Sequence, residues 1–459
     1  MNKCRRGLTV LVLLCCVLSF TFIGCTSEKK SEAQPNTNQG GTIQEKTQDK
    51  SEAKRKVVFW NCDGSPLFQD PLVAMAKRCM AKYPELDIEV VGLPYDSFQQ
   101  KLDVAVATKT NPDAGYIEIN NLPSYIEQGA IFDMNVYFNK WEHKDEFDPR
   151  RINWEGFSSD KARYIFPVEF AASSLWYRID FLKEIGMNAI STWDDFFTAA
   201  EKITDKSKNR YGFSMYVKNN GASRMEAYLL AYTGATSYFD ENGKCYMRDP
   251  RAVEGIAKFV SLYKVNTAES DITSGNADIV NSMIAGSAGL SFINTASYPV
   301  AHDALGDGVI GVMMPPAAPN GNKVLNIGRS QGGGIFTIFT NSKDNEAAWL
   351  YIAYMLEEDN NSEWCKATGV IPINDKAVAH EWVMNNPGLK SVSECMLNDP
   401  KMVQVSSPMF LPEYASIFEN IMQAGMQEML IGTKTAQQYV DDVSTALEEA
   451  KAAYDAKKK

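Results

Sequence analysis

The chain has 459 residues, with 46 Lys and Arg against 57 Asp and Glu, which gives a formal net charge of -11. Such an acidic chain is poorly suited to bind nucleic acid or an anionic membrane surface, so neither is an expected partner. Hydrophobic residues make up 45% and aromatic residues 11% of the chain, enough for ordinary cores, and roughly 400 residues beyond the N-terminal region indicate two domains.

The N-terminal region has the layout of a signal peptide. Lys3, Arg5 and Arg6 precede an uncharged apolar run at 8–22, which is too short to span a bilayer as a stable helix. The run ends at Phe-Ile-Gly-Cys25, which resembles a bacterial lipobox. That resemblance implies cleavage after residue 24 and a thioether-linked diacylglycerol on Cys25. The alternative is an ordinary secretory signal in which this cysteine is incidental.

A polar segment follows the expected cleavage site. Residues 26–55 contain one aliphatic side chain larger than alanine, Ile43. This segment cannot bury enough apolar surface to offset the entropy of ordering, so we expect 25–55 to be a disordered linker. Fully extended, it could reach on the order of 100 Å. The expected location is therefore the extracytoplasmic face of the cell membrane, with a lipid on Cys25 as the membrane contact.

Five cysteines remain beyond the signal region, namely Cys62, Cys79, Cys245, Cys365 and Cys395. An odd number cannot form a complete disulfide framework, and no CxxC or zinc-ligand spacing occurs. We expect buried free thiols with one disulfide at most, and neither a metal site nor a cofactor.

Hydrophobic periodicity indicates alternating strands and helices in the first part of the body. Strands are predicted at 56–60, 87–93 and 114–119, and helices at 72–83, 98–106 and 121–128. This order is typical of a parallel α/β sheet, which binds ligands beyond the carboxyl ends of its strands. Those ends are the polar loops 60–65 and 118–121.

The rest of the chain continues the mixed pattern. Thr192 can cap a helix at 193–203, with Asp194 and Asp195 near its positive end. Further strands are predicted at 166–170, 211–215, 290–293, 309–313 and 335–339. Further helices are predicted at 251–263, 279–285, 347–356, 414–430 and 435–454.

A series of short motifs, in order along nearly the whole body, resembles a known family. The motifs are Asn111-Pro112-Asp113, SLWYRIDFLKEIGM at 174–187, STWDDF at 191–196, Tyr211-Gly212-Phe213, MIAGSAGL at 283–290, GGGI at 332–335, EAAW at 346–349 and GVIPI at 369–373. Together they are similar to extracellular solute-binding proteins of the maltose-binding type (family 1), the lipoprotein receptors of ABC importers. The chain departs from the family pattern at Tyr177-Arg178 and at Ala296-Ser297-Tyr298, so the pocket chemistry cannot be transferred as a whole.

The resemblance implies an α/β fold of two lobes, with an interlobe cleft and several hinge crossovers. The first lobe would comprise 56–166 plus 313–358, and the second 167–312 plus 359–459. Hinge closure would capture a sugar or oligosaccharide and present it to ABC permease subunits. The protein would act as a monomer and would not be an enzyme.

Candidate ligand-binding residues in the first lobe lie in the two polar loops. A sugar ring can stack on Trp60, while Asp63 and Ser65 can exchange hydrogen bonds with its hydroxyl groups. Glu118 and Asn120 follow the third strand, at the position of the family's ligand loop.

The remaining candidates lie at the expected crossover, in the second lobe and in the glycine-rich segment 332–334. Glu169 is expected as an exposed carboxylate facing the cleft. Asn294 and Tyr298 follow a strand, where the family supplies an aromatic platform. Gly332 and Gly333 could bring backbone N–H groups close to a ligand, or could simply provide hinge flexibility. Arg224, in a polar segment, could serve either a ligand or the surface.

Three other functions stand as alternatives, namely a secreted hydrolase with a nucleophile elbow, a glycosidase, and a receptor for a non-sugar solute. Gly328-Arg329-Ser330-Gln331-Gly332 matches a G-x-S-x-G nucleophile elbow, but a strand rather than a helix is predicted to follow, and only His380 lies downstream as a base. No pair of carboxylates is placed for glycoside hydrolysis. A receptor for a peptide or a polyamine stays open, because Asp63, Glu118 and Glu169 could bind a cation.

Overall fold

The computed structural model describes residues 53–458, apart from 120, 219 and 329–333. Cys25, the signal peptide and nearly all of the predicted linker lie outside the described residues, as do Asn120, Ser330, Gly332 and Gly333. No helix within the described part of the chain is long and apolar enough to cross a membrane.

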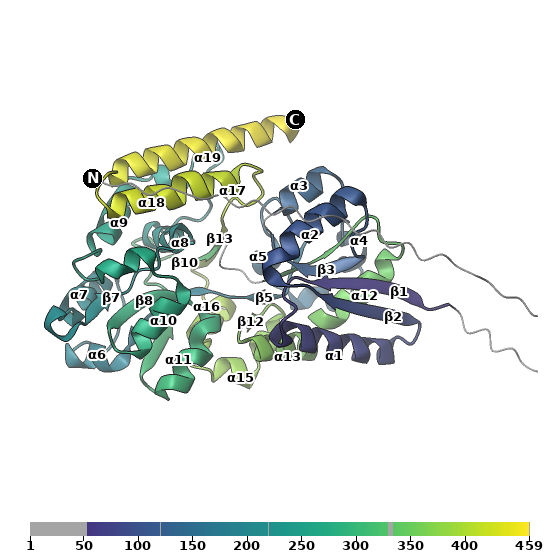
Figure 1. Cartoon of the computed structure of the whole chain (residues 1–459), viewed down its shortest axis with the longest axis horizontal. Helices are drawn as coiled ribbons and strands as arrows, with labels where there is room; N and C mark the ends of the chain where they lie inside the picture. The colour runs from purple at the N-terminus through teal and green to yellow at the C-terminus, as the bar shows by residue number, and fades with distance from the viewer. Residues whose placement is uncertain (1–52, 120, 219, 329–333, 459) are drawn as a thin grey trace, which may run out of the picture. The chain divides into compact units, whose positions relative to one another are not determined.

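A five-stranded sheet forms the core of what we call the first lobe (Figure 1). Its strand order is β2 (Leu86–Gly92), β1 (Arg55–Asn61), β3 (Ala114–Ile117), β11 (Ile335–Ile338) and β4 (Phe166–Pro167). β1 is parallel to β2 and β3, whereas β11 is antiparallel to β3 and β4. The predicted strand–helix alternation is confirmed, because α1 (Pro66–Lys82) and α2 (Tyr95–Thr108) connect the parallel strands.

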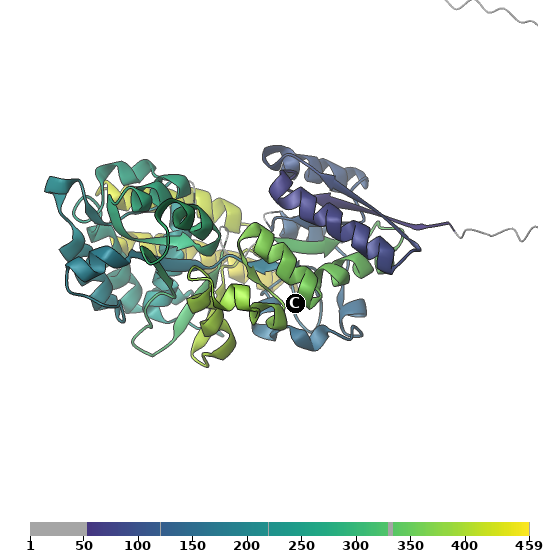
Figure 2. The same cartoon turned by 90° about the horizontal axis from the view of Figure 1, so that it is seen from below.

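Helices from two distant parts of the chain complete the first lobe. They are α3 (Leu122–Glu127), α4 (Asn135–Phe138), α5 (Pro149–Ile152), α12 (Asn345–Leu356), α13 (Glu358–Thr368) and α14 (Asp375–Val378). α12, which is buried along most of its length, packs on β1 and β11. Both α12 and α13 contact α1, and Figure 2 shows these green helices beside the purple one.

A four-stranded sheet forms the core of the second lobe. Its order is β7 (Tyr211–Phe213), β8 (Ala288–Asn294), β6 (Ser173–Arg178) and β9 (Ile310–Met313). α7 (Trp193–Ile203) begins at Thr192, as predicted, and Asp195 completes a capping box. α7 packs so closely on β7 that a Cβ at Gly212 would collide with the carbonyl group of Ala200, which explains the glycine of the Tyr-Gly-Phe motif.

The other helices of the second lobe are α6 (Ile179–Glu184), α8 (Gly221–Thr233), α9 (Pro250–Ser261), α10 (Asn276–Ile284), α11 (Tyr298–Leu305), α15 (Glu381–Met384), α16 (Lys390–Asn398), α17 (Tyr414–Ile417), α18 (Ala424–Leu430) and α19 (Ala436–Lys458). A π-helical turn, Phe418–Gln423, joins α17 to α18, and α19 lies alongside both (Figure 1). Short 3₁₀ turns occur at Lys144–Glu146, Lys206–Lys208, Tyr246–Arg248, Glu269–Thr273 and Thr295–Ser297.

The pairing in two small sheets helps to locate the places where the chain passes between the lobes. β5 (Glu169–Phe170) pairs with β12 (Ile371–Pro372), and β10 (Lys323–Ile327) pairs with β13 (Met402–Ser406). Because β9 ends at Met313 inside the second sheet and β10 packs on α8, we draw the second crossing between β10 and β11 instead of at 313. Because α13 packs on α1, we draw the third crossing after α14 instead of at 359. We propose these revised lobe boundaries on strand pairing and helix packing.

A buried carboxylate, Glu226, supports the segment that follows β13. Glu226 lies on α8 and is 1% exposed. It accepts hydrogen bonds from the hydroxyl groups of Tyr238 (2.6 Å), Ser407 (2.7 Å) and Tyr414 (3.5 Å). Burial raises the pKa of Glu226 to about 7, although these hydrogen bonds oppose the rise.

The raised pKa of Glu226 predicts that stability falls at neutral pH. The folded state binds this proton more tightly than the unfolded chain, whose ordinary glutamate pKa is 4.5. The stabilisation is therefore complete below pH 4.5 and is lost as the pH rises through 7, at a cost on the order of 3 kcal/mol. Chemical unfolding of the wild type and of Glu226→Gln at pH 5 and pH 8 measures this loss, which the variant should lack.

Glu241→Gln serves as the control, because Glu241 is an exposed acid of the same lobe. It should keep the wild-type dependence of stability on pH. If Glu226→Gln keeps that dependence as well, the assignment to Glu226 is wrong.

Candidate ligand-binding site at the carboxyl edges of the two sheets

The loop after β1 is held in shape by its own polar groups. The side-chain amide of Asn61 donates to the carbonyl oxygen of Asp63 (2.6 Å) and to Oε1 of Gln69 (3.0 Å). Oδ1 of Asp63 accepts from the backbone N–H of Ser65 (2.9 Å). Ser65 is exposed and its hydroxyl does not cap α1, so this hydroxyl remains available to a ligand.

Trp60 lies near the end of β1, beside Val91 of β2 and Gly115 of β3. Its side chain is half-buried and packs partly against the core of the first lobe. Part of the ring therefore remains accessible, as stacking requires, and its contact with a ligand stays a prediction.

The loop after β3 is tied to α2. Oε1 of Glu118 accepts a hydrogen bond from the hydroxyl group of Tyr95 (2.5 Å), and the pKa of Tyr95 is raised, chiefly by burial and also by this carboxylate. The amide of Asn121 donates to Oδ1 of Asp103 (2.9 Å). Asn120, the predicted contact between them, lies outside the described residues.

The prediction of an exposed carboxylate at Glu169 is wrong. Glu169 is 4% exposed and accepts from the hydroxyl of Tyr116 (2.9 Å), the backbone N–H of Gly334 (3.2 Å) and the indole N–H of Trp364. Burial raises its pKa, and the three donors oppose that rise. The carboxylate therefore stabilises the crossover segment through these hydrogen bonds.

In the second lobe, polar groups gather at the carboxyl end of β8. Asn294 ends this strand opposite Ser173 of β6 and is half-buried. Oδ1 of Asn294 accepts from the hydroxyl of Ser297 (3.2 Å), which in turn accepts from the amide of Asn276 (3.1 Å). These groups form a connected polar edge.

Tyr298 does not join this edge, so the prediction that its ring faces the cleft is wrong. The ring is 5% exposed and stands edge-on to Trp176, with 6.0 Å between centroids. A Cβ at Gly388 would collide with it. Tyr298 is therefore a core residue of the second lobe.

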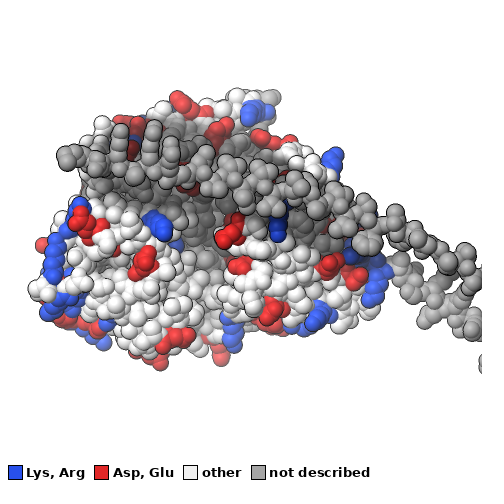
Figure 3. Space-filling model, viewed as in Figure 1, with Lys and Arg blue, Asp and Glu red and all other residues white. Residues whose placement is uncertain are grey.

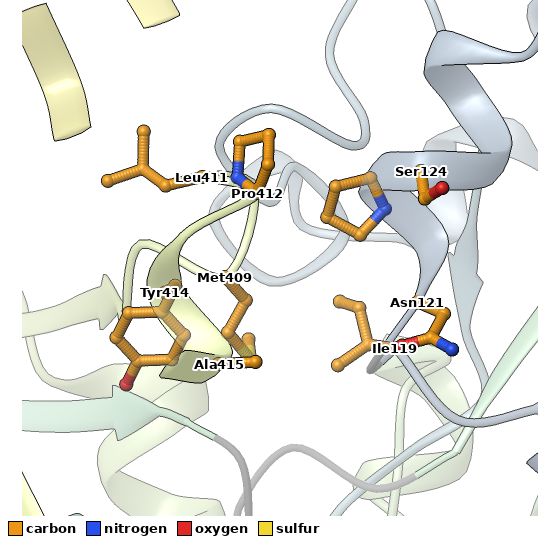
Figure 4. Close-up of a pocket in the computed structure, with 9 residues that line it drawn as sticks. Ile119, Asn121, Ser124, Met409, Leu411, Pro412, Tyr414 and Ala415 are labelled. Carbon is orange, nitrogen blue, oxygen red and sulfur yellow. The ribbon is translucent and has the colours of Figure 1, made fainter. Parts of the chain in front are cut away.

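A cavity of about 110 Å³ lies between segments of the two lobes. Figure 4 shows Ile119 and Asn121 on one side, facing Met409 and Ala415 on the other. Pro123 and Ser124 complete the first wall, and Leu411, Pro412 and Tyr414 the second. No motif in the sequence marks the segment 409–415 as part of a site; the two prolines of SSPMFLPEY are its one local signal, and they fit an irregular connection.

The sequence left open whether Arg224 serves a ligand or the surface. This residue lies in the first turn of α8 and is 3% exposed, so a surface role is excluded.

The charged side chains on the face seen in Figure 3 are of both signs and are scattered among uncharged ones.

The base that the hydrolase hypothesis requires, His380, is engaged in other hydrogen bonds. The two ring nitrogens of His380 are bonded to the hydroxyl of Ser362 (2.8 Å) and to Oε1 of Glu358 (2.9 Å). Glu358, Asp359 and His380 also form the one group of possible metal ligands found in the described ranges. Strand β11 follows the G-x-S-x-G motif, as predicted, where a nucleophile elbow requires a helix.

All five cysteines beyond the signal region are free and buried, as expected. Burial raises the pKa of each thiol. The thiols therefore stay protonated at neutral pH.

Comparison with known proteins extends over most of the chain. A binding protein of Brucella abortus is 24% identical over 385 residues, which cover 82% of this chain and 88% of the relative. The sugar-binding protein MalE of Xanthomonas citri has a TM-score of 0.72 at 16% identity, covering 87% of this chain and 98% of its own. An ABC transporter solute-binding protein of Thermotoga lettingae, bound with alpha-D-tagatose, has a TM-score of 0.68 at 20% identity, covering 87% and 100%.

The fold is thus the two-lobe α/β fold of periplasmic solute-binding proteins. The family described as bacterial extracellular solute-binding protein matches residues 74–391, well over half of the chain. The protein belongs to this family of bacterial extracellular solute-binding proteins.

Proposed function

We propose that the protein is the receptor of an ABC importer, which captures a sugar or oligosaccharide between its lobes and delivers it to the permease subunits. The observation that carries the proposal is the cavity between the loop after β3 and residues 409–415 of the second lobe, because ligands bind beyond the carboxyl ends of such strands. Several structural neighbours are sugar-binding proteins or have a sugar bound, which supports the ligand class.

Closure would take place at the three crossings. The pairing of β5 with β12 has only two residue pairs, Ile371 with Phe170 and Pro372 with Glu169. A connection this small can absorb changes in backbone angle while each sheet moves as a unit. A ligand that contacts both edges stabilises the closed arrangement, which the permease would recognise.

The composition of the edges favours a sugar over a polyamine. Of the three acids that kept a polyamine possible, Glu169 is buried in the crossover and Glu118 accepts from Tyr95. A partly exposed indole at Trp60, with the carboxylate of Asp63 and the hydroxyl of Ser65 nearby in sequence, suits sugar C–H faces and hydroxyl groups.

Thermal-shift screening against neutral and acidic sugars, oligosaccharides and polyamines tests the ligand class. A ligand at 100 times its Kd stabilises the folded protein by about 2.7 kcal/mol, which raises Tm measurably. Stabilisation by polyamines alone would contradict the proposal.

Trp60→Ala should weaken binding of a sugar hit by on the order of 1–3 kcal/mol, because the stacking face is lost. Calorimetric titration measures the loss. Tyr83→Ala is the matched control: Tyr83 is also half-buried in the first lobe but caps the far end of α1, next to the start of β2. Equal loss in both variants would show that the effect comes from the fold and not from stacking.

Lipid anchoring is also proposed, with Cys25 as the modified residue. Cys25→Ala should move the protein from the membrane fraction to the soluble fraction without changing its unfolding transition, because residues 52–459 form a compact unit separate from 1–51. Fractionation and thermal unfolding measure the two effects. A variant that stays in the membrane after signal removal would contradict the lipobox assignment. We further propose that the released protein is a monomer.

A further inference from the structure

One buried cation of the second lobe lacks the partners that the other buried arginines have. Arg224 is 3% exposed, and its Nε and Nη1 are fully buried without a hydrogen-bond partner in the described part of the chain. Nε and Nη1 of Arg151 are also buried without a hydrogen-bond partner, but Arg151 forms an ion pair with Asp375, and Arg178 forms one with Asp180. Arg163 donates to Asn135, to Asn153 and to a backbone carbonyl oxygen.

An uncompensated buried charge is costly. Removing a guanidinium from water costs several kcal/mol unless an opposite charge or good acceptors replace the solvent. Burial lowers the pKa of Arg224 to about 10, so the group remains charged at neutral pH. The two buried acids of neighbouring segments do not compensate it. Glu226 is bonded to Tyr238 and Ser407, and Asp271 accepts from the backbone N–H of Met215 (2.7 Å).

The position of Arg224 connects it with the polar edge of the second sheet. It lies in the first turn of α8, directly after the loop that leaves the carboxyl end of β7. Its guanidinium carbon is 5.7 Å from the ring centroid of Tyr216 in that loop. Tyr216 in turn lies beside Gly275, next to Asn276, which starts the hydrogen-bonded series to Asn294. Arg224 and Asn294 thus follow adjacent parallel strands at one edge.

We propose that Arg224 receives an anionic group of the captured sugar, a carboxylate or a phosphate, so that the physiological ligand is an acidic sugar. This inference rests on the proposed function. A guanidinium presents parallel N–H donors that match the oxygen atoms of either anion. Hydroxyl groups of a neutral sugar would satisfy the donors but leave the charge uncompensated. The exposed Lys218, in the same loop as Tyr216, adds positive charge nearby.

Calorimetric titration with matched pairs of sugars tests the inference. The pairs are D-galacturonate with D-galactose, digalacturonate with galactobiose, and glucose 6-phosphate with glucose; they also distinguish a carboxylate from a phosphate. The wild type should bind the acidic member of at least one pair at least tenfold more tightly than the neutral member. Arg224→Gln should abolish this preference and leave the affinity for the neutral member within threefold.

Two further variants separate a specific contact from general effects. Lys218→Gln removes an exposed charge from the same loop and should change the preference less than threefold. Arg224→Lys keeps the charge without the fork of donors and should retain part of the preference. Without ligand, Arg224→Gln should unfold at the wild-type Tm or above, because it removes an uncompensated charge.

The outcomes are distinct. Equal binding of neutral and acidic members by the wild type, or a preference that survives in Arg224→Gln, overturns the inference but leaves the proposed function intact. A lower Tm of unliganded Arg224→Gln overturns it as well, because it would show a structural role. If no sugar binds, the proposed function fails. Thermal shift with inorganic phosphate then still decides on the anion site, since only the wild type should be stabilised.

Discussion

The carboxylate of Glu169 joins the segments along which the chain passes between its lobes. It lies on β5, in the first crossing, and its donors come from β3, from Gly334 next to β11, and from Trp364 on α13. An ionised carboxylate is a pure acceptor, so three converging donors match it without leaving a buried polar group unpaired. Asn361 reinforces the arrangement, because its amide donates to Val168 and its oxygen accepts from Ile373. This buried network therefore fixes the three crossing segments to the first lobe.

In both lobes, buried polar groups beneath the site are matched by hydrogen-bond partners. Asn61 fixes the loop after β1, and Glu226 fixes the exit of β13 through Ser407. Buried networks of this kind are costly when incomplete and rigid when satisfied, so they define the two walls sharply. Arg224 departs from this pattern, since its Nε and Nη1 are buried without a hydrogen-bond partner and no acid among the described residues pairs with it. Its charge is therefore suited to select ligands that carry an anionic group.

The sequence predicted those elements whose pattern is local. Periodicity located the helices at α1 and α7, and Thr192 with Asp195 marked a helix start that the structure has. It did not identify α8, because GASRMEAYLLAYT is buried on nearly all sides and lacks an amphipathic period. The lobe boundaries that we propose in place of 313 and 359 depend on contacts that no local pattern reveals, since β10 pairs with a strand far along the chain and α13 packs on a helix near the N-terminus. Candidate residues at strand ends were located in sequence, but their burial depends on tertiary neighbours. The lack of a side chain at Gly388 leaves room for the buried ring of Tyr298, and the indole N–H of Trp364 is a hydrogen-bond donor to the buried carboxylate of Glu169.

The place of β11 in the first sheet has a consequence for how the protein is made. β11 lies between β3 and β4, so β4 has no strand partner in this sheet until the chain has been synthesised through β11. The first lobe therefore cannot complete its sheet during early synthesis, although four of its five strands precede β11 in the chain. Long-range pairing of this kind slows folding and lowers the stability of partial chains. A nascent chain that stays incompletely folded until late is compatible with export in an unfolded form, whereas a lobe that closed early would have to be opened again before it could pass through a narrow channel.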